Sequence, residues 1–229
     1  MKLKAVGDRG VLAELGDSIS ESINRNVMEL NQKVRFAASE GILETVPAFA
    51  SLLVYYNPLI TDFEEVSRFL INISKASGES VTETGKLVRI PVCYGGIHGM
   101  DLSFVAEHSG LKEEEVIEIH SGRDYRIYML GFLPGFPYLG GMDERIITPR
   151  LSVPRTKIPA GSVGIGGEQT GIYPMESPGG WQLIGRTPLR LFDPQMGQKG
   201  RYQAGDSIRF VPINQKEFDE ISQTPEMRW

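Results

Sequence analysis

The chain has 229 residues, of which 41% are hydrophobic and 23% charged, the proportions of a globular protein with one large or two small domains. Its net charge of −5 and its isoelectric point near 5.4 argue against a general nucleic-acid or membrane-surface binder. The single cysteine, Cys93, excludes an internal disulfide framework and a cysteine-rich metal site, and its apolar neighbours indicate a buried structural thiol.

The N-terminal residues lack the apolar segment of a signal peptide, and no apolar run approaches the ~20 residues of a transmembrane helix, so we expect a cytoplasmic protein. Residues 1–80 have the pattern of a small α+β domain with the order ββαββα. Two S/T-x-x-E capping boxes, Ser18 with Glu21 and Thr61 with Glu64, begin its helices. The predicted elements are Lys2–Val6, Val11–Leu15, Ser18–Ser39, Ile42–Phe49, Ser51–Tyr56 and Thr61–Ala76.

A polar, aperiodic segment, Ser77–Lys86, is predicted to link this domain to a second one that spans residues 87–229. Residues Asp101–Gly122 have the pattern of two helices around a glycine turn, as in a helix-turn-helix. Three consecutive acidic residues, Glu113–Glu115, would face the phosphates of DNA, so we expect this helix pair to plug or flank the second domain instead. The other elements predicted outside the central stretch are strands Leu87–Tyr94, Asp124–Gly131 and Gly205–Pro212, and a helix Asn214–Ile221.

The central stretch, Gly131–Pro194, holds nine of the fourteen prolines, and its glycines come in clusters. Proline excludes a helix here, and clustered glycines suit turns, bulges and close backbone approach. Short apolar runs at Ser162–Ile165, Gln182–Ile184 and Leu189–Phe192 are typical of short strands. Seven or eight strands with few helices predict a closed or nearly closed antiparallel β-barrel.

The polar residues of this stretch are mostly basic. We predict an anion site formed by Arg150, Arg155 and Arg186, because guanidinium groups on proline-restricted loops suit bidentate carboxylate or phosphate binding. Thr170 could add a hydroxyl, and Gly179-Gly180-Trp181 could place an indole beside the ligand. The alternatives remain open: the arginines could be ordinary solvated residues, and Trp181 could be a core anchor.

No phosphate loop, nucleophile elbow or metal-binding histidine motif occurs, so no metal site is predicted. His98 and His108 are expected at the surface. His120 closes an acidic helix just before the strand that leads into the central stretch. It is either a capping histidine at the negative end of that helix or a proton carrier or ligand contact at the mouth of the barrel.

The motifs MLGFLPGFPYLGG, PRTKIPAGSVGIGGEQTGIYP and SPGGWQLIGRTP closely resemble the allophanate hydrolase subunit 1 family. The resemblance covers the whole chain and is sharpest from Val92 to Pro194. It implies a cyclophilin-like barrel after the small α+β domain. It also favours a functional role for His120, because the family pattern has a histidine before its GF-x-PGF-x-Y segment.

The family includes the B subunit of the bacterial ATP-dependent 5-oxoprolinase and a Bacillus inhibitor of a sporulation histidine kinase. The first member implies an enzyme subunit that acts with subunits A and C on 5-oxo-L-proline. ATP, with Mg²⁺, would then be held wholly or partly by a partner subunit. For such an enzyme we predict catalytic roles for His120, Arg155 and Arg186, and binding roles for Arg150, Thr170, Gly179, Gly180 and Trp181; the resemblance itself supports only the role of His120.

Exposed apolar groups would form the subunit interface: Phe132, Leu133, Phe136 and Tyr138. The second family member implies instead a module that docks on a histidine kinase. A third possibility is a urea- or allophanate-related carboxyltransfer component with biotin on another chain. No biotin-attachment motif occurs in this chain, where Met1-Lys2 is the only Met-Lys pair.

Overall fold

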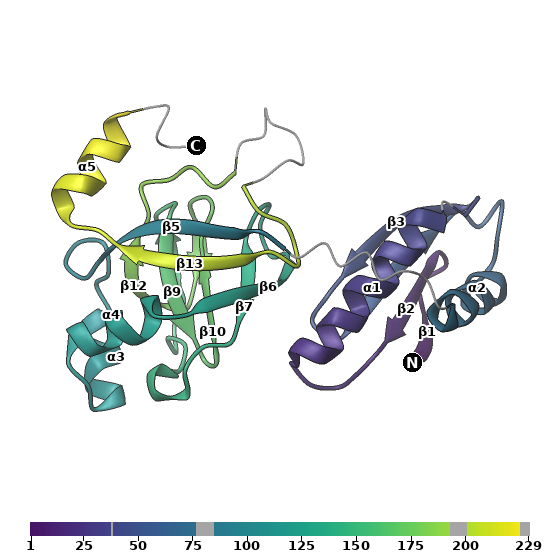
Figure 1. Cartoon of the computed structure of the whole chain (residues 1–229), viewed down its shortest axis with the longest axis horizontal. Helices are drawn as coiled ribbons and strands as arrows, with labels where there is room; N and C mark the ends of the chain where they lie inside the picture. Colours follow the sequence, from purple (N-terminus) through teal and green to yellow (C-terminus); the bar gives the residue numbers. More distant parts are fainter. Residues whose placement is uncertain (38, 77–84, 193–200, 225–229) are drawn as a thin grey trace. The chain divides into compact units, whose positions relative to one another are not determined.

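The computed structural model describes residues 1–37, 39–76, 85–192 and 201–224. The chain divides into two compact units, Met1–Glu83 and Thr84–Trp229 (Figure 1). Most of the predicted linker, Ser77–Lys86, lies outside the described residues. Within the described ranges, no helix has both the length and the apolar character needed to cross a membrane.

The first unit is an antiparallel four-stranded sheet, with the strand order β1-β2-β4-β3, and two helices. The alternation of buried and partly buried residues along β2 and β4 places one face of the sheet against the helices. That face packs with Val27 and Leu30 of α1 and Leu70 of α2. The element order ββαββα is as predicted: β1 (Lys2–Val6), β2 (Gly10–Glu14), α1 (Glu21–Ala37), β3 (Ile42–Pro47), β4 (Ser51–Tyr56) and α2 (Phe63–Lys75).

Both predicted capping boxes of this unit are wrong. The side chain of Asp62 caps α2, because its carboxylate accepts the backbone N–H of Glu65. Helix α1 begins at Glu21, so Ile19 lies outside the helix and is exposed instead of joining its buried face. For α2, the prediction chose Thr61 over the adjacent Asp62, which is the stronger N-cap residue. For α1, it placed the start of the helix too early in the chain.

The second unit is a closed seven-stranded barrel with the strand order β10-β7-β6-β13-β5-β12-β9 (Figure 1). The predicted barrel is therefore confirmed, but it is not wholly antiparallel, since β13 pairs in parallel with β5. A separate two-stranded sheet pairs β8 with β11. The strands are β5 (Leu87–Tyr94), β6 (Asp124–Leu130), β7 (Pro137–Gly140), β8 (Arg155–Ile158), β9 (Ser162–Gly166), β10 (Gln169–Ile172), β11 (Ser177–Gly179), β12 (Gln182–Arg186) and β13 (Ser207–Pro212).

The helices of this unit pack on the barrel. Leu102, Val105 and Val116 join the barrel's own core, so the pair that resembled a helix-turn-helix serves packing. His98, expected at the surface, is buried, where its ring lies 4.1 Å from that of Phe218. The helices are α3 (Leu102–Ser109), α4 (Glu113–Ser121), the 3₁₀ turn η1 (Glu144–Ile146) and α5 (Gln215–Gln223).

Candidate functional site

The glycines of the central stretch form a flat outer wall for Trp181. A Cβ atom at Gly166 would lie 2.5 Å from the indole, and one at Gly171 would lie 3.0 Å from it. Only glycine lets the ring approach the strand backbone so closely. Phe136, Tyr173 and Trp181 pack edge to face around this contact and form an apolar cluster separate from the barrel core.

Arg155 is held beside this cluster by an ion pair with Asp101. Its Nη2 donates to Asp101 Oδ1 at 2.6 Å, and its Nη1 donates to the carbonyl of Trp181 at 3.2 Å. The other oxygen of Asp101 accepts the backbone N–H of Leu183 at 2.6 Å. Both charged side chains are largely buried. Asp101 therefore ties the start of α3 to β8 and β12.

The structure brings most of the predicted binding residues together. Gly179 pairs with Arg155 across β11 and β8, and the carbonyl of Gly180 accepts the N–H of Leu151 at 2.7 Å. The guanidinium of Arg150 lies 5.7 Å above the ring of Trp181, a cation–π contact. This group thus combines a buried, rigid aromatic cluster with one exposed guanidinium, that of Arg150.

Arg186 lies elsewhere on the barrel. Its Nε donates to the carbonyl of Ala160 at 2.8 Å, and within the described part of the chain no carboxylate pairs with it. Partial burial lowers the pKa of this guanidinium below its usual value. A partly desolvated cation without a counter-charge is suited to an external anion.

His120 lies inside the barrel, fully buried between aromatic rings. Its ring stacks on Phe210 at 4.5 Å, its Nδ1 lies 2.8 Å from the hydroxyl of Tyr94, and its Nε2 lies 2.8 Å from that of Thr170. Because side-chain hydroxyls engage both ring nitrogens, His120 does not cap α4 through its ring. The hydroxyl of Tyr125 donates to the backbone carbonyl of His120.

The hydrogen bonds fix the tautomer of His120. The hydroxyl of Thr170 donates its one proton to the carbonyl of Gly164 at 3.0 Å, so it must accept from His120 Nε2–H. Nδ1 is then the acceptor, and the hydroxyl of Tyr94 donates to it. Burial lowers the pKa of His120 to about 3, so the imidazole is neutral at physiological pH.

The two groups of predicted residues lie on opposite faces of one strand. Thr170 points inward to His120, whereas the next residue, Gly171, faces the indole of Trp181. His120 and Thr170 therefore do not share a surface with Arg150 and Trp181. Sequence reasoning missed two partners, Asp101 and Tyr94, because each meets its contact only through long-range folding.

The expected exposed apolar rim is wrong for Phe136, which is buried, while Leu133 and Tyr138 are half-buried. Trp181 is buried too, in agreement with the core-anchor alternative. Phe132 is 61% exposed. Its φ of 65° makes it the one non-glycine in the described ranges with a left-handed backbone, a conformation that costs about 1 kcal/mol or more.

Acidification should destabilise the barrel through His120. Its pKa is about 3 when folded and near 6.5 when unfolded, so below pH 6.5 the unfolded state gains the proton first. The free energy of unfolding should fall by about 2.5 kcal/mol between pH 7 and 4.5 from this group. Urea unfolding followed by Trp181 fluorescence in a Trp229→Phe background measures it. The His120→Gln variant should lack this part of the pH dependence. If its free energy of unfolding changes with pH as steeply as that of the parent chain, the buried neutral imidazole is contradicted.

Removing Asp101 should cost more stability than removing its arginine. Asp101→Ala leaves both Arg155 and the N–H of Leu183 without their acceptor, so we expect a loss of about 2–4 kcal/mol. Arg155→Ala should cost about 1–2 kcal/mol, and Arg150→Ala, at an exposed site, about 0.5 kcal/mol or less. Denaturant unfolding of the three variants tests this order, and equal losses for Asp101→Ala and Arg150→Ala would refute it.

A family model described as carboxyltransferase domain, subdomain C and D, matches residues 1–200. Proteins named as the B subunit of 5-oxoprolinase are close relatives. The one from Bacillus subtilis is 43% identical over 227 residues, which are 95% of either chain. The one from Haemophilus influenzae is 46% identical over 211 residues, 92% of this chain and 97% of the relative.

Solved structures also resemble this chain. An uncharacterised protein from Pyrococcus horikoshii is 52% identical, with a TM-score of 0.57 over 95% of this chain and 100% of its own. The urea amidolyase of Kluyveromyces lactis shares the fold at 21% identity, with a TM-score of 0.80 over 98% of this chain and 15% of its own. These matches confirm the resemblance that the motifs indicated: the chain belongs to the family described as carboxyltransferase domain, subdomain C and D.

Proposed function

We propose that the chain is the B subunit of an ATP-dependent 5-oxoprolinase, which acts with subunits A and C. The assembly would convert 5-oxo-L-proline, ATP and water to L-glutamate, ADP and phosphate. The observation that carries this proposal is the 43% and 46% identity to proteins of that name over nearly their whole length. The barrel would be of the cyclophilin-like kind that the motifs imply.

The chemistry needs positive charge more than a nucleophile from this chain. A five-membered lactam is an unreactive amide, and phosphorylation of its oxygen makes the ring carbon open to attack by water. Phosphoryl transfer depends mainly on positioning and on electrostatic stabilisation. Arg186 and Arg150 suit that task, since neither is paired with a carboxylate in the described ranges.

The remaining predicted residues support the site indirectly under this proposal. Arg155 is engaged with Asp101 and positions Trp181, and His120 with Thr170 keeps the barrel wall in register as a neutral pair. ATP and its Mg²⁺ would be held wholly or partly by a partner subunit. In the part of the chain that the structure describes, no three His, Cys, Asp or Glu side chains converge as metal ligands would.

A second candidate function is the inhibition of a histidine kinase by docking. The observation that favours it is Phe132, whose exposed ring and left-handed backbone are typical of a contact residue. The third candidate function is carboxyltransfer with biotin on another chain. The family description favours it, but no residue of the site described above does.

The purified chain alone should release no glutamate from 5-oxoproline and ATP. Glutamate release should begin only after subunits A and C are added. The sequence contains no nucleophile elbow, phosphate loop or metal-binding histidine motif from which this chain alone could build an active site. Turnover by the chain alone would refute a shared active site. An inactive full mixture, together with tight binding to the dimerisation helices of a histidine kinase, would favour the inhibitor.

Arg186→Ala and Arg150→Ala should each lower glutamate release by the assembled enzyme roughly tenfold or more, with nearly unchanged melting temperatures. Arg145→Ala is the matched control, because its guanidinium is already paired with Asp143 at 3.0 Å. Full activity in both test variants, or an equal loss in the control, would remove the anion-binding role.

A further inference from the structure

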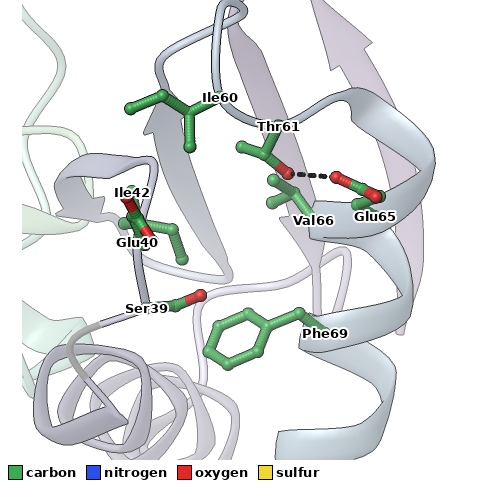
Figure 2. A pocket seen from close by; sticks show the side chains of 8 residues that line it. All are labelled: Ser39, Glu40, Ile42, Ile60, Thr61, Glu65, Val66 and Phe69. Atoms are coloured by element: carbon green, nitrogen blue, oxygen red, sulfur yellow. Dashed lines mark hydrogen bonds between the residues drawn. The ribbon is translucent and has the colours of Figure 1, made fainter.

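The first unit has a groove of its own. It has a volume of about 290 Å³ and lies between the segment that follows α1 and the start of α2 (Figure 2). Half of its eight lining residues are apolar: Ile42, Ile60, Val66 and Phe69. Figure 2 shows the ring of Phe69 reaching from α2 toward Ser39 on the opposite side. The groove is therefore built from three separate segments.

The charged side chains that line the groove are both acidic. Glu40 and Glu65 line it, and none of its eight lining residues is cationic. The hydroxyl of Thr61 donates to Glu65 Oε2 at 3.0 Å, which holds that carboxylate at the groove (Figure 2). An occupant with an apolar body and a basic group would match both the walls and the charge.

Size and surroundings decide between a free ligand and a protein segment. A volume of 290 Å³ is at the lower limit for ligand sites and suits about one large side chain, not a nucleotide. Leu59, which precedes the lining residue Ile60 in the chain, is 92% exposed. A single small molecule in the groove would leave Leu59 in water, whereas a protein segment could cover it.

We propose that this groove is a docking site for a partner subunit of the assembly, which inserts an apolar side chain flanked by a lysine or arginine. The proposal rests on the proposed function for the existence of such a partner. It adds a second interface, on the first unit, to the contacts expected around Phe132. Its role is assembly and not chemistry.

The test uses the whole chain with purified subunits A and C and a pair of matched variants. Ile60→Asp places a carboxylate against the acidic groove at a site that is 52% exposed, and Ile19→Asp makes the same change in the same unit at a site that is 53% exposed. We expect Ile60→Asp to weaken binding roughly tenfold and Ile19→Asp less than about twofold, with equal melting temperatures. Glu40→Lys should also weaken binding and reduce its salt dependence.

Sedimentation and titration calorimetry distinguish the outcomes. If the Ile60→Asp variant binds the partner subunits as tightly as the wild-type chain, the docking site is overturned. The same holds if Ile19→Asp weakens binding as much as Ile60→Asp does. Both outcomes leave the proposed function intact. A wild-type chain that neither binds A and C nor supports glutamate release with them removes the proposed function, and the docking site with it. A chain that dimerises alone and loses its dimer in Ile60→Asp would make the groove a contact between copies, which also overturns the proposal.

Discussion

The contact of one indole with bare strand backbone shapes the outer side of the barrel. Trp181 can lie on β9 and β10 only because positions 166 and 171 are glycines. That contact seats the cluster of Phe136 and Tyr173, and the carbonyl of Trp181 accepts a hydrogen bond from Arg155. The clustered glycines therefore serve the close backbone approach that the sequence indicated, and here they form a packing surface.

The same strands separate two kinds of polar chemistry. On the inner face, the chain of hydrogen bonds from Tyr94 through His120 and Thr170 ends on a backbone carbonyl, so every donor is used. On the outer face, charge is balanced at Arg155 by Asp101 but left available at Arg150. A buried neutral imidazole with both nitrogens engaged contributes order, whereas a guanidinium over an aromatic ring can still meet an anion.

Much of the fold followed from pattern, because long periodic elements carry their own signal. Strand β5 has the predicted bounds, Leu87–Tyr94, and both helices of the first unit are in place. The short strands β7, β8, β10 and β11 could not be found, since three or four residues rich in glycine and proline have no periodicity. The run Leu189–Phe192 gave the opposite error: Leu191 is buried by packing without being a strand. The partners of Arg155 and His120 were equally unpredictable, because Asp101 and Tyr94 reach them across the fold.

The parallel pairing of β5 with β13 affects how the protein can be made on the ribosome. Leu87 at the start of the barrel pairs with Ser207, and the N–H of Lys86 donates to Asp206, 120 residues later. The seventh strand therefore completes the barrel only after nearly the whole chain has emerged, whereas the strands and helices of the first unit end at Lys75. Contacts of such long sequence separation form slowly, so during synthesis the apolar inner faces of β5 and β6 must wait for their last neighbour.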